Sequence, residues 1–204
     1  MPSELEDRLS RLSSALYPPH YPLEDLLVDG YRPEAGAWRP RAAAVLVPIV
    51  LKPTPAVLLT VRSDALKSHA GQVALPGGGR SGNECFPLDT ALREAEEEIG
   101  IDPVCVKILG LARCFDTISA YRVVPVVGLI DSAPQLQACP REVRCIFSAP
   151  LERVLDVASY RRHQVRHHHR DYEVWSMLSE QWPIWGATAA ILAHLAGLAS
   201  QHNA

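Results

Sequence analysis

Residues 75–101 read LPGGGRSGNECFPLDTALREAEEEIGI, a glycine-rich turn followed by a segment loaded with acidic residues. Apolar residues recur in the second half at spacings of four, three and four, which predicts a helix with one apolar stripe facing a core. The stripe consists of Leu88, Leu92, Ala95 and Ile99. On such a helix Glu94, Glu97 and Glu98 stand at i, i+3 and i+4, so we expect their carboxylates to share one face, opposite the stripe.

This acidic face predicts a metal site. Like charges four residues apart weaken a bare helix by about 0.2–0.5 kcal/mol per pair, and a divalent cation would reverse that effect. Magnesium and manganese choose carboxylate and carbonyl oxygens, and magnesium is often shared with substrate phosphates. The turn Gly77-Gly78-Gly79 lets backbone approach a ligand closely, so its amides can face phosphate oxygens. The alternative is a solvated acidic helix after a turn.

The order of the residues resembles a known family. Residues 93–101, REAEEEIGI, match the R-E-U-x-E-E-x-G-U half of the Nudix box, where U is apolar. Gly78 and Glu84 supply the other half, a glycine and a glutamate separated by five residues. The chain is therefore identified as a member of the Nudix hydrolases, and the resemblance implies an α/β fold, the Nudix α/β/α sandwich with a mixed β-sheet.

One spacing departs from the box. Eight residues separate Glu84 from Arg93, where the general pattern has seven. Starting the box at Gly79 restores the seven but puts Cys85 in the place of the glutamate, so Glu84 is the better match and its role stays open. We expect the extra residue in the turn before the helix, with Asp89 as the N-cap.

A second motif lies upstream. Residues 58–63, LLTVRS, are followed by Lys67, Gly71 and the turn LPGG, with the spacing that marks the coenzyme A pyrophosphatase branch of Nudix proteins. Lys67 replaces an arginine of that motif, and Leu75 replaces a phenylalanine. The lysine gives up planar bidentate pairing with phosphate for a point charge. The resemblance implies substrate binding by Arg62, Ser63, Lys67, Gly71, Gly77 and Gly78.

The implied reaction is metal-dependent hydrolysis of the pyrophosphate bond of coenzyme A or its derivatives. Its products are 4′-phosphopantetheine, or the acyl form, and adenosine 3′,5′-bisphosphate. The implied cofactor is Mg²⁺ or Mn²⁺, held by Glu94, Glu97 and Glu98. Two alternatives stay open: a Nudix pyrophosphatase for another nucleoside diphosphate derivative, such as ADP-ribose or a dinucleotide, and a non-catalytic Nudix domain that senses a nucleotide.

The catalytic candidates are Glu97, Arg93 and Glu142. A carboxylate of the box can orient or deprotonate the attacking water, and Arg93 lies four residues before Glu97, where it can hold that side chain. In many Nudix chains a glutamate from the region of Glu142 assists the metal or the water, which makes Glu142 the candidate general base. Its alternative role is a surface carboxylate paired with Arg141 or Arg144.

Composition limits the other possibilities. The 204 residues are 48% hydrophobic and 21% charged, as in an ordinary soluble globular protein, and the net charge of −3 argues against a nucleic-acid partner. Five cysteines without C-x-x-C spacing indicate reduced, mostly buried thiols. The chain has neither an apolar run of about 20 residues nor a signal-peptide pattern at its start, so we expect a cytoplasmic protein without membrane contact. Apolar terminal helices make a homodimer an open possibility.

Residues 1–41 are expected to form an N-terminal helix, over 3–16, and a proline-rich irregular connection, packed on a single Nudix domain of residues 42–204. Within that domain the apolar runs and periodicities predict strands at 42–51, 56–61, 105–112, 123–130 and 172–178, a short helix at 151–157 and a last helix at 184–199. The basic segment 161–170 is expected to be a hairpin or loop. It is either simply solvated or reaches the extra phosphate of coenzyme A.

Overall fold

Two long apolar strands lie side by side at the centre of the fold. β2, Arg41–Val50, runs parallel to β8, Tyr121–Ile130, with ten residues of each in register. Most residues of both strands are buried on both faces, as expected for parallel strands that are covered from either side. Strands added on both sides of this pair complete a mixed nine-stranded sheet. Six strands follow one another in the order β1-β7-β8-β2-β3-β4, while β5 pairs with β2, β6 with β8 and β9 with β3.

The computed structural model describes residues 3–31, 39–167, 170–179 and 181–201. The remaining strands of the large sheet are β1 Val28–Gly30, β3 Ala56–Arg62, β4 Val73–Ala74, β5 Gly77–Gly79, β6 Lys107–Leu111, β7 Cys114–Asp116 and β9 Val143–Pro150. A three-stranded sheet holds β10 Tyr160–His167, β11 Arg170–Met177 and β12 Ile184–Trp185. The α-helices are α1 Glu4–Ala15, α2 Leu88–Ile99, α3 Leu151–Val154 and α4 Gly186–Ser200.

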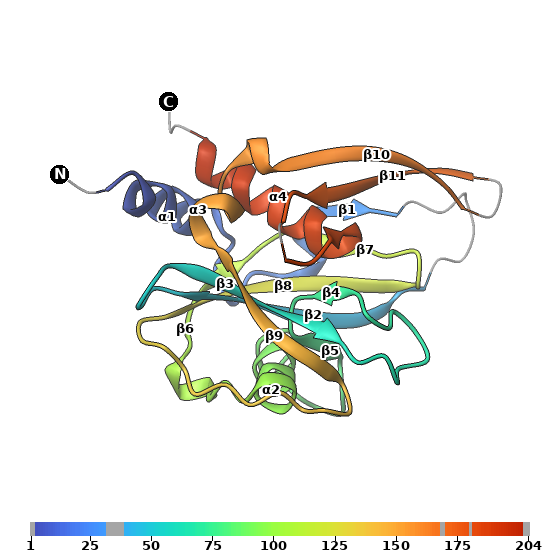
Figure 1. Cartoon of the computed structure of the whole chain (residues 1–204), viewed down its shortest axis with the longest axis horizontal. Coiled ribbons are helices and arrows are strands. Elements are labelled where there is room, and N and C mark those ends of the chain that lie inside the picture. Colours follow the sequence, from blue (N-terminus) through green and yellow to red (C-terminus); the bar gives the residue numbers. More distant parts are fainter. Residues whose placement is uncertain (1–2, 32–38, 168–169, 180, 202–204) are drawn as a thin grey trace.

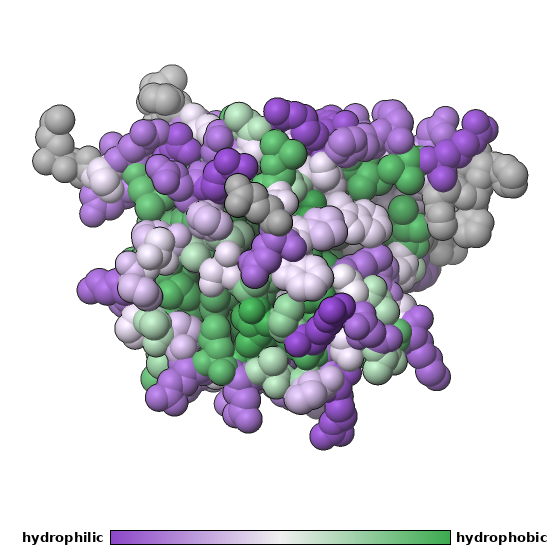
Figure 2. All heavy atoms as spheres, viewed as in Figure 1, coloured by the Kyte–Doolittle hydropathy of each residue, from purple (hydrophilic) through white to green (hydrophobic). Residues whose placement is uncertain are grey.

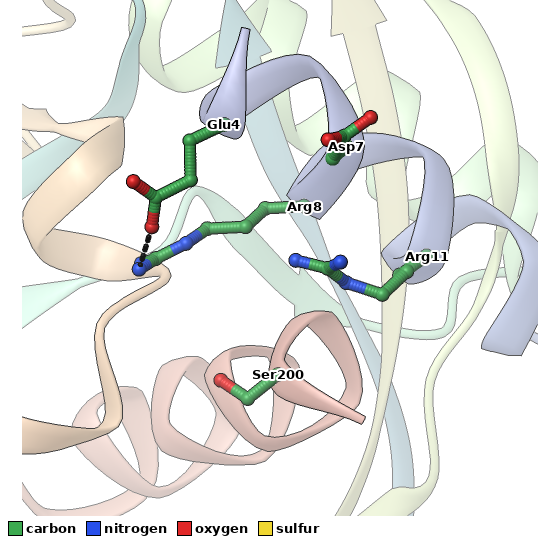
Figure 3. A pocket seen from close by; sticks show the side chains of 5 residues that line it. All are labelled: Glu4, Asp7, Arg8, Arg11 and Ser200. Carbon is green, nitrogen blue, oxygen red and sulfur yellow. Dashed lines mark hydrogen bonds and ion pairs between the residues drawn. The ribbon is translucent and has the colours of Figure 1, made fainter. Parts of the chain in front are cut away.

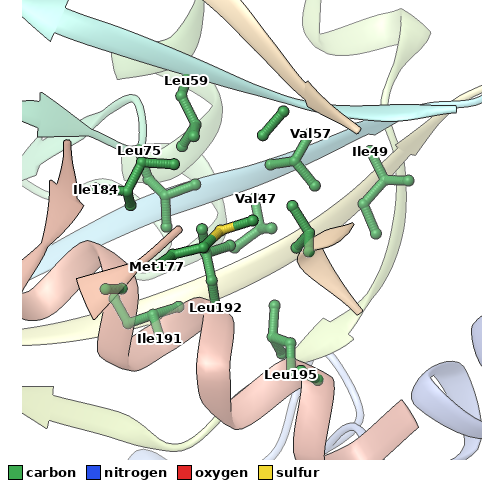
Figure 4. Close-up of a cluster of buried hydrophobic side chains, with 14 of the residues drawn as sticks. Val47, Ile49, Val57, Leu59, Leu75, Met177, Ile184, Ile191, Leu192 and Leu195 are labelled. Carbon is green, nitrogen blue, oxygen red and sulfur yellow. The ribbon is translucent and has the colours of Figure 1, made fainter. Parts of the chain in front are cut away.

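Helices cover both faces of the large sheet, so the expected α/β/α sandwich with a mixed sheet is confirmed (Figure 1). α2 lies alone on one face, where Ala91, Ala95 and Ile99 are buried. α1, α3, α4 and the small sheet lie over the other face. There Leu192 and Leu195 of α4 pack against sheet side chains that include Val47 (Figure 4). The two faces of the sheet thus carry separate hydrophobic clusters.

The predicted N-terminal helix is present. Ser3 caps α1 and forms a capping box with Glu6. Leu12 is fully buried, while Arg11 donates a hydrogen bond of 2.8 Å from Nε to the carbonyl of Ala199 at the end of α4. A pocket of about 280 Å³ between α1 and the end of α4 is lined by charged side chains of α1 and by Ser200 (Figure 3). These contacts fix α1 on α4.

The expectation that residues 17–41 lack regular structure is wrong at residues 23–25, which form a short 3-10 helix, at residues 28–30, and at Arg41, where β2 begins. Residues 28–30 form β1, which pairs in parallel with β7, Cys114–Asp116. Three residues are too few to give a periodic signal, and the pairing comes from a segment far along the chain. Residues 32–38, which include Pro33, lie outside the described residues.

The other predicted elements lie where expected, with bounds shifted by a few residues. The predicted helix at 151–157 is shorter, ending at Val154. The segment expected to be a hairpin or loop, residues 161–170, belongs to the antiparallel pair of β10 and β11, and Figure 2 shows hydrophilic residues gathered along this pair. The expected burial of most cysteines is wrong, because Cys85 and Cys105 are exposed and only Cys114 of the five is buried. Within the described residues, none of the helices has the length and apolar character needed to cross a membrane.

A half-buried histidine in α4, His194, predicts how stability depends on pH. Burial, with a smaller contribution from the positive charge of Arg113, lowers the pKa of His194 to about 4, and the negative charge of Asp29 partly opposes this. The unfolded chain has a histidine pKa of about 6.5, so between these values the unfolded state binds the proton and the folded state does not. Stability is therefore full above about pH 6.5 and falls as the pH drops towards 4, by about 2 kcal/mol between about pH 7.5 and pH 5.

Urea unfolding at the two pH values measures this loss, and His194→Gln is expected to remove most of it. His163→Gln, in the exposed part of the hairpin, serves as the matched control and should keep the wild-type decline. If His194→Gln loses as much stability as the wild type, another group causes the pH dependence.

Candidate active site

Two carboxylates of α2 face the glycine strand β5 instead of solvent. The predicted turn at Gly77–Gly79 is wrong, because these residues pair antiparallel with β2. The side chain of Glu98 is buried, and its Oε2 accepts a hydrogen bond of 3.2 Å from the backbone N–H of Gly77. The Glu94 carboxylate lies so close to Gly78 that a Cβ there would overlap it. The sequence placed the acidic residues opposite the buried stripe, which is wrong for Glu98. Small residues bring α2 close to β5, and Glu98 is drawn into that contact.

Burial sets the electrostatics of this pair. Desolvation raises the pKa of Glu98 to about 7, while the Gly77 N–H and the positive charge of Arg62 oppose the rise. Desolvation also raises the pKa of Glu94, with Arg93 opposing it. The negative charge of Glu142 raises both values further. Three carboxylates therefore lie within electrostatic range of one another, where a cation would relieve their repulsion.

Glu84 holds the turn and the box arginine together. Its Oε1 accepts hydrogen bonds from the N–H of Ser81 at 2.6 Å and from the Thr90 hydroxyl at 2.5 Å, and its Oε2 accepts one from Arg93 Nε at 3.1 Å. These bonds, the one from Thr90 most of all, lower the pKa of Glu84 to about 2. The extra residue in the box thus leaves Glu84 within reach of Arg93.

The start of α2 differs from the expectation. The helix begins at Leu88, and its N-cap position is Pro87, so the expectation of Asp89 as the N-cap is wrong. Asp89 instead accepts a hydrogen bond of 2.8 Å from the N–H of Cys85. Proline at this position has no N–H to satisfy, and the aspartate side chain closes the turn from inside the first turn of the helix.

Arg93 lies among three carboxylates. Besides Glu84, its Nη1 lies 2.8 Å from Glu94 and 3.2 Å from Glu97. The side chain of Glu97 is 61% exposed, against 15% for Glu94, so Glu97 stays at the outer edge of the site. The i,i+4 contact between Arg93 and Glu97 is present as the spacing predicts. The structure brings Glu94 and Glu98 to the glycine strand β5 and leaves Glu97 further out.

The loop after β3 lies beside these carboxylates. Arg62 lowers the pKa of Glu98 by its charge, and the Arg62 Nε is buried without a hydrogen-bond partner among the described residues. Ser63 is buried, whereas Lys67 is exposed. Gly71 has a φ of +70° and donates its N–H to the Arg62 carbonyl at 3.1 Å, which closes the loop on itself. The loop thus presents Arg62 inwards and Lys67 outwards.

Glu142 lies at the junction of the loop and the carboxylates. Its carbonyl accepts a hydrogen bond of 2.8 Å from the N–H of Ser63, just before β9 begins at Val143. Of its two expected surface partners, Arg144 pairs with Asp64 instead, at 3.2 Å. From this position, within electrostatic range of Glu94 and Glu98, Glu142 could orient or deprotonate a water molecule bound there. Its role as general base stays a prediction.

The donor set fits a hard divalent cation. Glu94, Glu98 and Glu142 offer carboxylate oxygens, and β5 offers backbone carbonyls. Magnesium and manganese prefer such oxygen ligands. In the described part of the chain, no three acidic, histidine or cysteine side chains already stand in the arrangement of a finished metal site. Small rotations of these carboxylates would be needed to enclose an ion, with Glu97 reaching in from the edge.

The fold and this site define an α/β/α protein in which the acidic helix α2 packs against the glycine strand β5. Residues 40–167 match the family model described as NUDIX domain, so the chain belongs to the Nudix family. A relative from Escherichia coli K12, named as an uncharacterized Nudix hydrolase NudL, is 41% identical over 156 residues, which are 76% of this chain and 81% of the relative. A relative of the same name from Klebsiella pneumoniae strain 342 is 39% identical, over 81% of this chain and 86% of the relative.

Solved structures with a similar fold include a MutT protein from Methanosarcina mazei Go1, with a TM-score of 0.47, 23% identity and coverage of 59% of this chain and 84% of that chain. A C. elegans Ap4A hydrolase gives a TM-score of 0.47 with 21% identity, over 54% of this chain and 80% of that chain. Nudix hydrolases cleave pyrophosphate bonds in nucleoside diphosphate derivatives, generally with divalent metal ions, and this chain is a member of that class.

Proposed function

We propose that this protein hydrolyses the pyrophosphate bond of coenzyme A or its derivatives, with Mg²⁺ or Mn²⁺. One observation carries the proposal: Arg62, from the LLTVRS segment, lies within electrostatic range of Glu98 of the Nudix box, and its buried Nε has no hydrogen-bond partner within the described residues. The segment that resembles the coenzyme A motif thus meets the carboxylates of the family motif at one site. A buried, unpaired guanidinium nitrogen is costly and favours a bound anion such as a diphosphate.

The side chains divide the work as follows. Glu94 and Glu98, with Glu97 from the edge, would hold the cation, which when bound neutralises negative charge that develops on the phosphate oxygens. Arg62 would donate hydrogen bonds to a diphosphate oxygen. Glu142 would orient the attacking water and accept its proton. Arg93, fixed by Glu84, would keep Glu94 and Glu97 in place.

The reaction joins the water oxygen to one phosphorus atom and breaks that atom's bond to the bridging oxygen. From coenzyme A it gives 4′-phosphopantetheine and adenosine 3′,5′-bisphosphate, while acyl derivatives give the acyl form of the first product. The proposal also includes a single Nudix domain of residues 42–204 with residues 1–41 packed on it. A homodimer is a further possibility within the proposal.

The test is chromatographic separation of the products after incubation of the full chain with coenzyme A, ADP-ribose and a dinucleotide, each with magnesium or manganese. We expect coenzyme A to be cleaved with the highest kcat/KM. Faster cleavage of ADP-ribose or the dinucleotide would retain the Nudix chemistry and reject the coenzyme A assignment. Binding of a nucleotide without any product would instead support a sensing role.

A further inference from the structure

Arg144 is the extra residue of a β-bulge at the edge of the candidate active site. Along the antiparallel pair of β3 and β9, Val61 lies opposite Cys145 and Arg62 lies opposite Val143, which leaves Arg144 without an opposite residue. A bulge removes a residue from the ladder and re-aims its side chain, and bulges are common beside active sites. The side chain of Arg144 is 52% exposed.

Two contacts hold the guanidinium of Arg144 in place. Its Nη1 donates to Asp64 Oδ2 at 3.2 Å, and its Cζ lies 5.4 Å from the centre of the Trp182 ring. Asp64 belongs to the loop that carries Arg62, and Trp182 precedes β12. An exposed ion pair of this kind contributes only about 0–1 kcal/mol to stability. Stability therefore gives little reason for the bulge, whereas a fixed positive charge at the edge of the site does.

The place of Arg144 suits a second phosphate of the substrate. Glu142 lies within electrostatic range of the metal carboxylates, and Arg144 follows it two residues later, directly after Val143, which lies opposite Arg62. Arg62 is the inner cation, next to Glu98. Arg144, with its side chain 52% exposed, is the outer cation. In coenzyme A the 3′-phosphate is separated from the diphosphate by one ribose, which matches an inner and an outer arginine.

We propose that Arg144, stacked on Trp182, binds the 3′-phosphate of the substrate nucleotide and makes the enzyme prefer substrates that carry it. This inference rests on the proposed function. Within the described residues Arg144 uses only Nη1 in a hydrogen bond, so its other N–H groups remain available for a planar, charge-assisted contact with phosphate oxygens.

The hairpin arginines make different contacts. Arg161 donates to the carbonyls of Ala158 and Tyr160, both at 2.8 Å. Arg162 pairs with Glu173 at 2.9 Å and stacks on an aromatic ring, Trp175, as Arg144 does on Trp182. Its side chain is 56% exposed, close to the value for Arg144. Arg162 is therefore a matched control, with the same kind of surroundings away from the bulge.

The experiment compares kcat/KM for coenzyme A and for 3′-dephospho-coenzyme A in the wild type, Arg144→Gln and Arg162→Gln. Arg144→Gln should lower kcat/KM for coenzyme A by about 10- to 100-fold, mainly through KM, and leave that for the dephospho substrate within about twofold. Arg162→Gln should behave as the wild type on both. An equal loss on both substrates, or a selective loss in Arg162→Gln, overturns the inference.

A binding measurement separates this inference from the proposed function. If the wild type cleaves neither substrate, the proposed function fails. Thermal shifts with adenosine 3′,5′-bisphosphate and adenosine 5′-monophosphate then decide about Arg144. A larger shift with the bisphosphate that disappears in Arg144→Gln supports the site, whereas equal shifts in the wild type reject it.

Discussion

Glu98→Gln is expected to lower kcat for pyrophosphate hydrolysis by about 1,000-fold, equivalent to about 4 kcal/mol of barrier. The glutamine keeps the shape of the side chain and its contact with the Gly77 N–H but removes the negative charge that would hold a cation. Glu98 is 4% exposed and pays for its burial as a carboxylate, so the neutral variant should be no less stable than the wild type. Activity and stability are thus expected to respond differently.

Steady-state kinetics over a range of magnesium concentrations, with a thermal melt of each variant, measures both effects. Glu96→Gln is the matched control, because Glu96 lies on the same helix but is exposed, and its activity should stay within about twofold of the wild type. A Glu98→Gln enzyme with wild-type kcat would remove Glu98 from the metal site. Equal losses in both variants would indicate a general effect of helix charge.

Gly78→Ala is expected to fold and to lose about 100-fold in kcat/KM. A Cβ at Gly78 would overlap the carboxylate of Glu94, and the flexible end of that side chain is what would move. The displaced Glu94 carboxylate would leave its place beside β5, and a shift of about 1 Å in an active site can cost about 100-fold in rate. The backbone of Gly78 does not itself require glycine, since its φ lies outside the left-handed range.

Gly79→Ala provides the comparison, because a Cβ at Gly79 meets nothing within 4 Å. Kinetics and thermal melts of the two alanine variants should therefore differ in activity and agree closely in melting temperature. Unchanged activity in Gly78→Ala would mean that the position of the Glu94 carboxylate is not critical. A similar loss in Gly79→Ala would assign the effect to the reduced backbone flexibility of β5.

The sequence by itself determined the family, the layer architecture and the elements with strong periodicity. Residues 42–51 form a continuous apolar run because β2 is buried on both faces, and such a run is visible without any knowledge of its neighbours. The box is equally visible, because its spacing is local: Arg93 and Glu97 make contact in the structure since one helical turn separates them.

Only the tertiary structure decided which acidic residue is buried and where Arg144 lies. From the sequence, Glu97 and Glu98 are equally good candidates for metal ligands on one face of the helix. In the structure, close packing of α2 on β5 buries Glu98 and leaves Glu97 exposed. Arg144 carries no signal in the sequence, because the bulge that exposes it is a property of pairing between β3 and β9. Contacts within one helical turn follow from local spacing, whereas burial and register depend on segments far apart in the chain and appear only when the sheet is assembled.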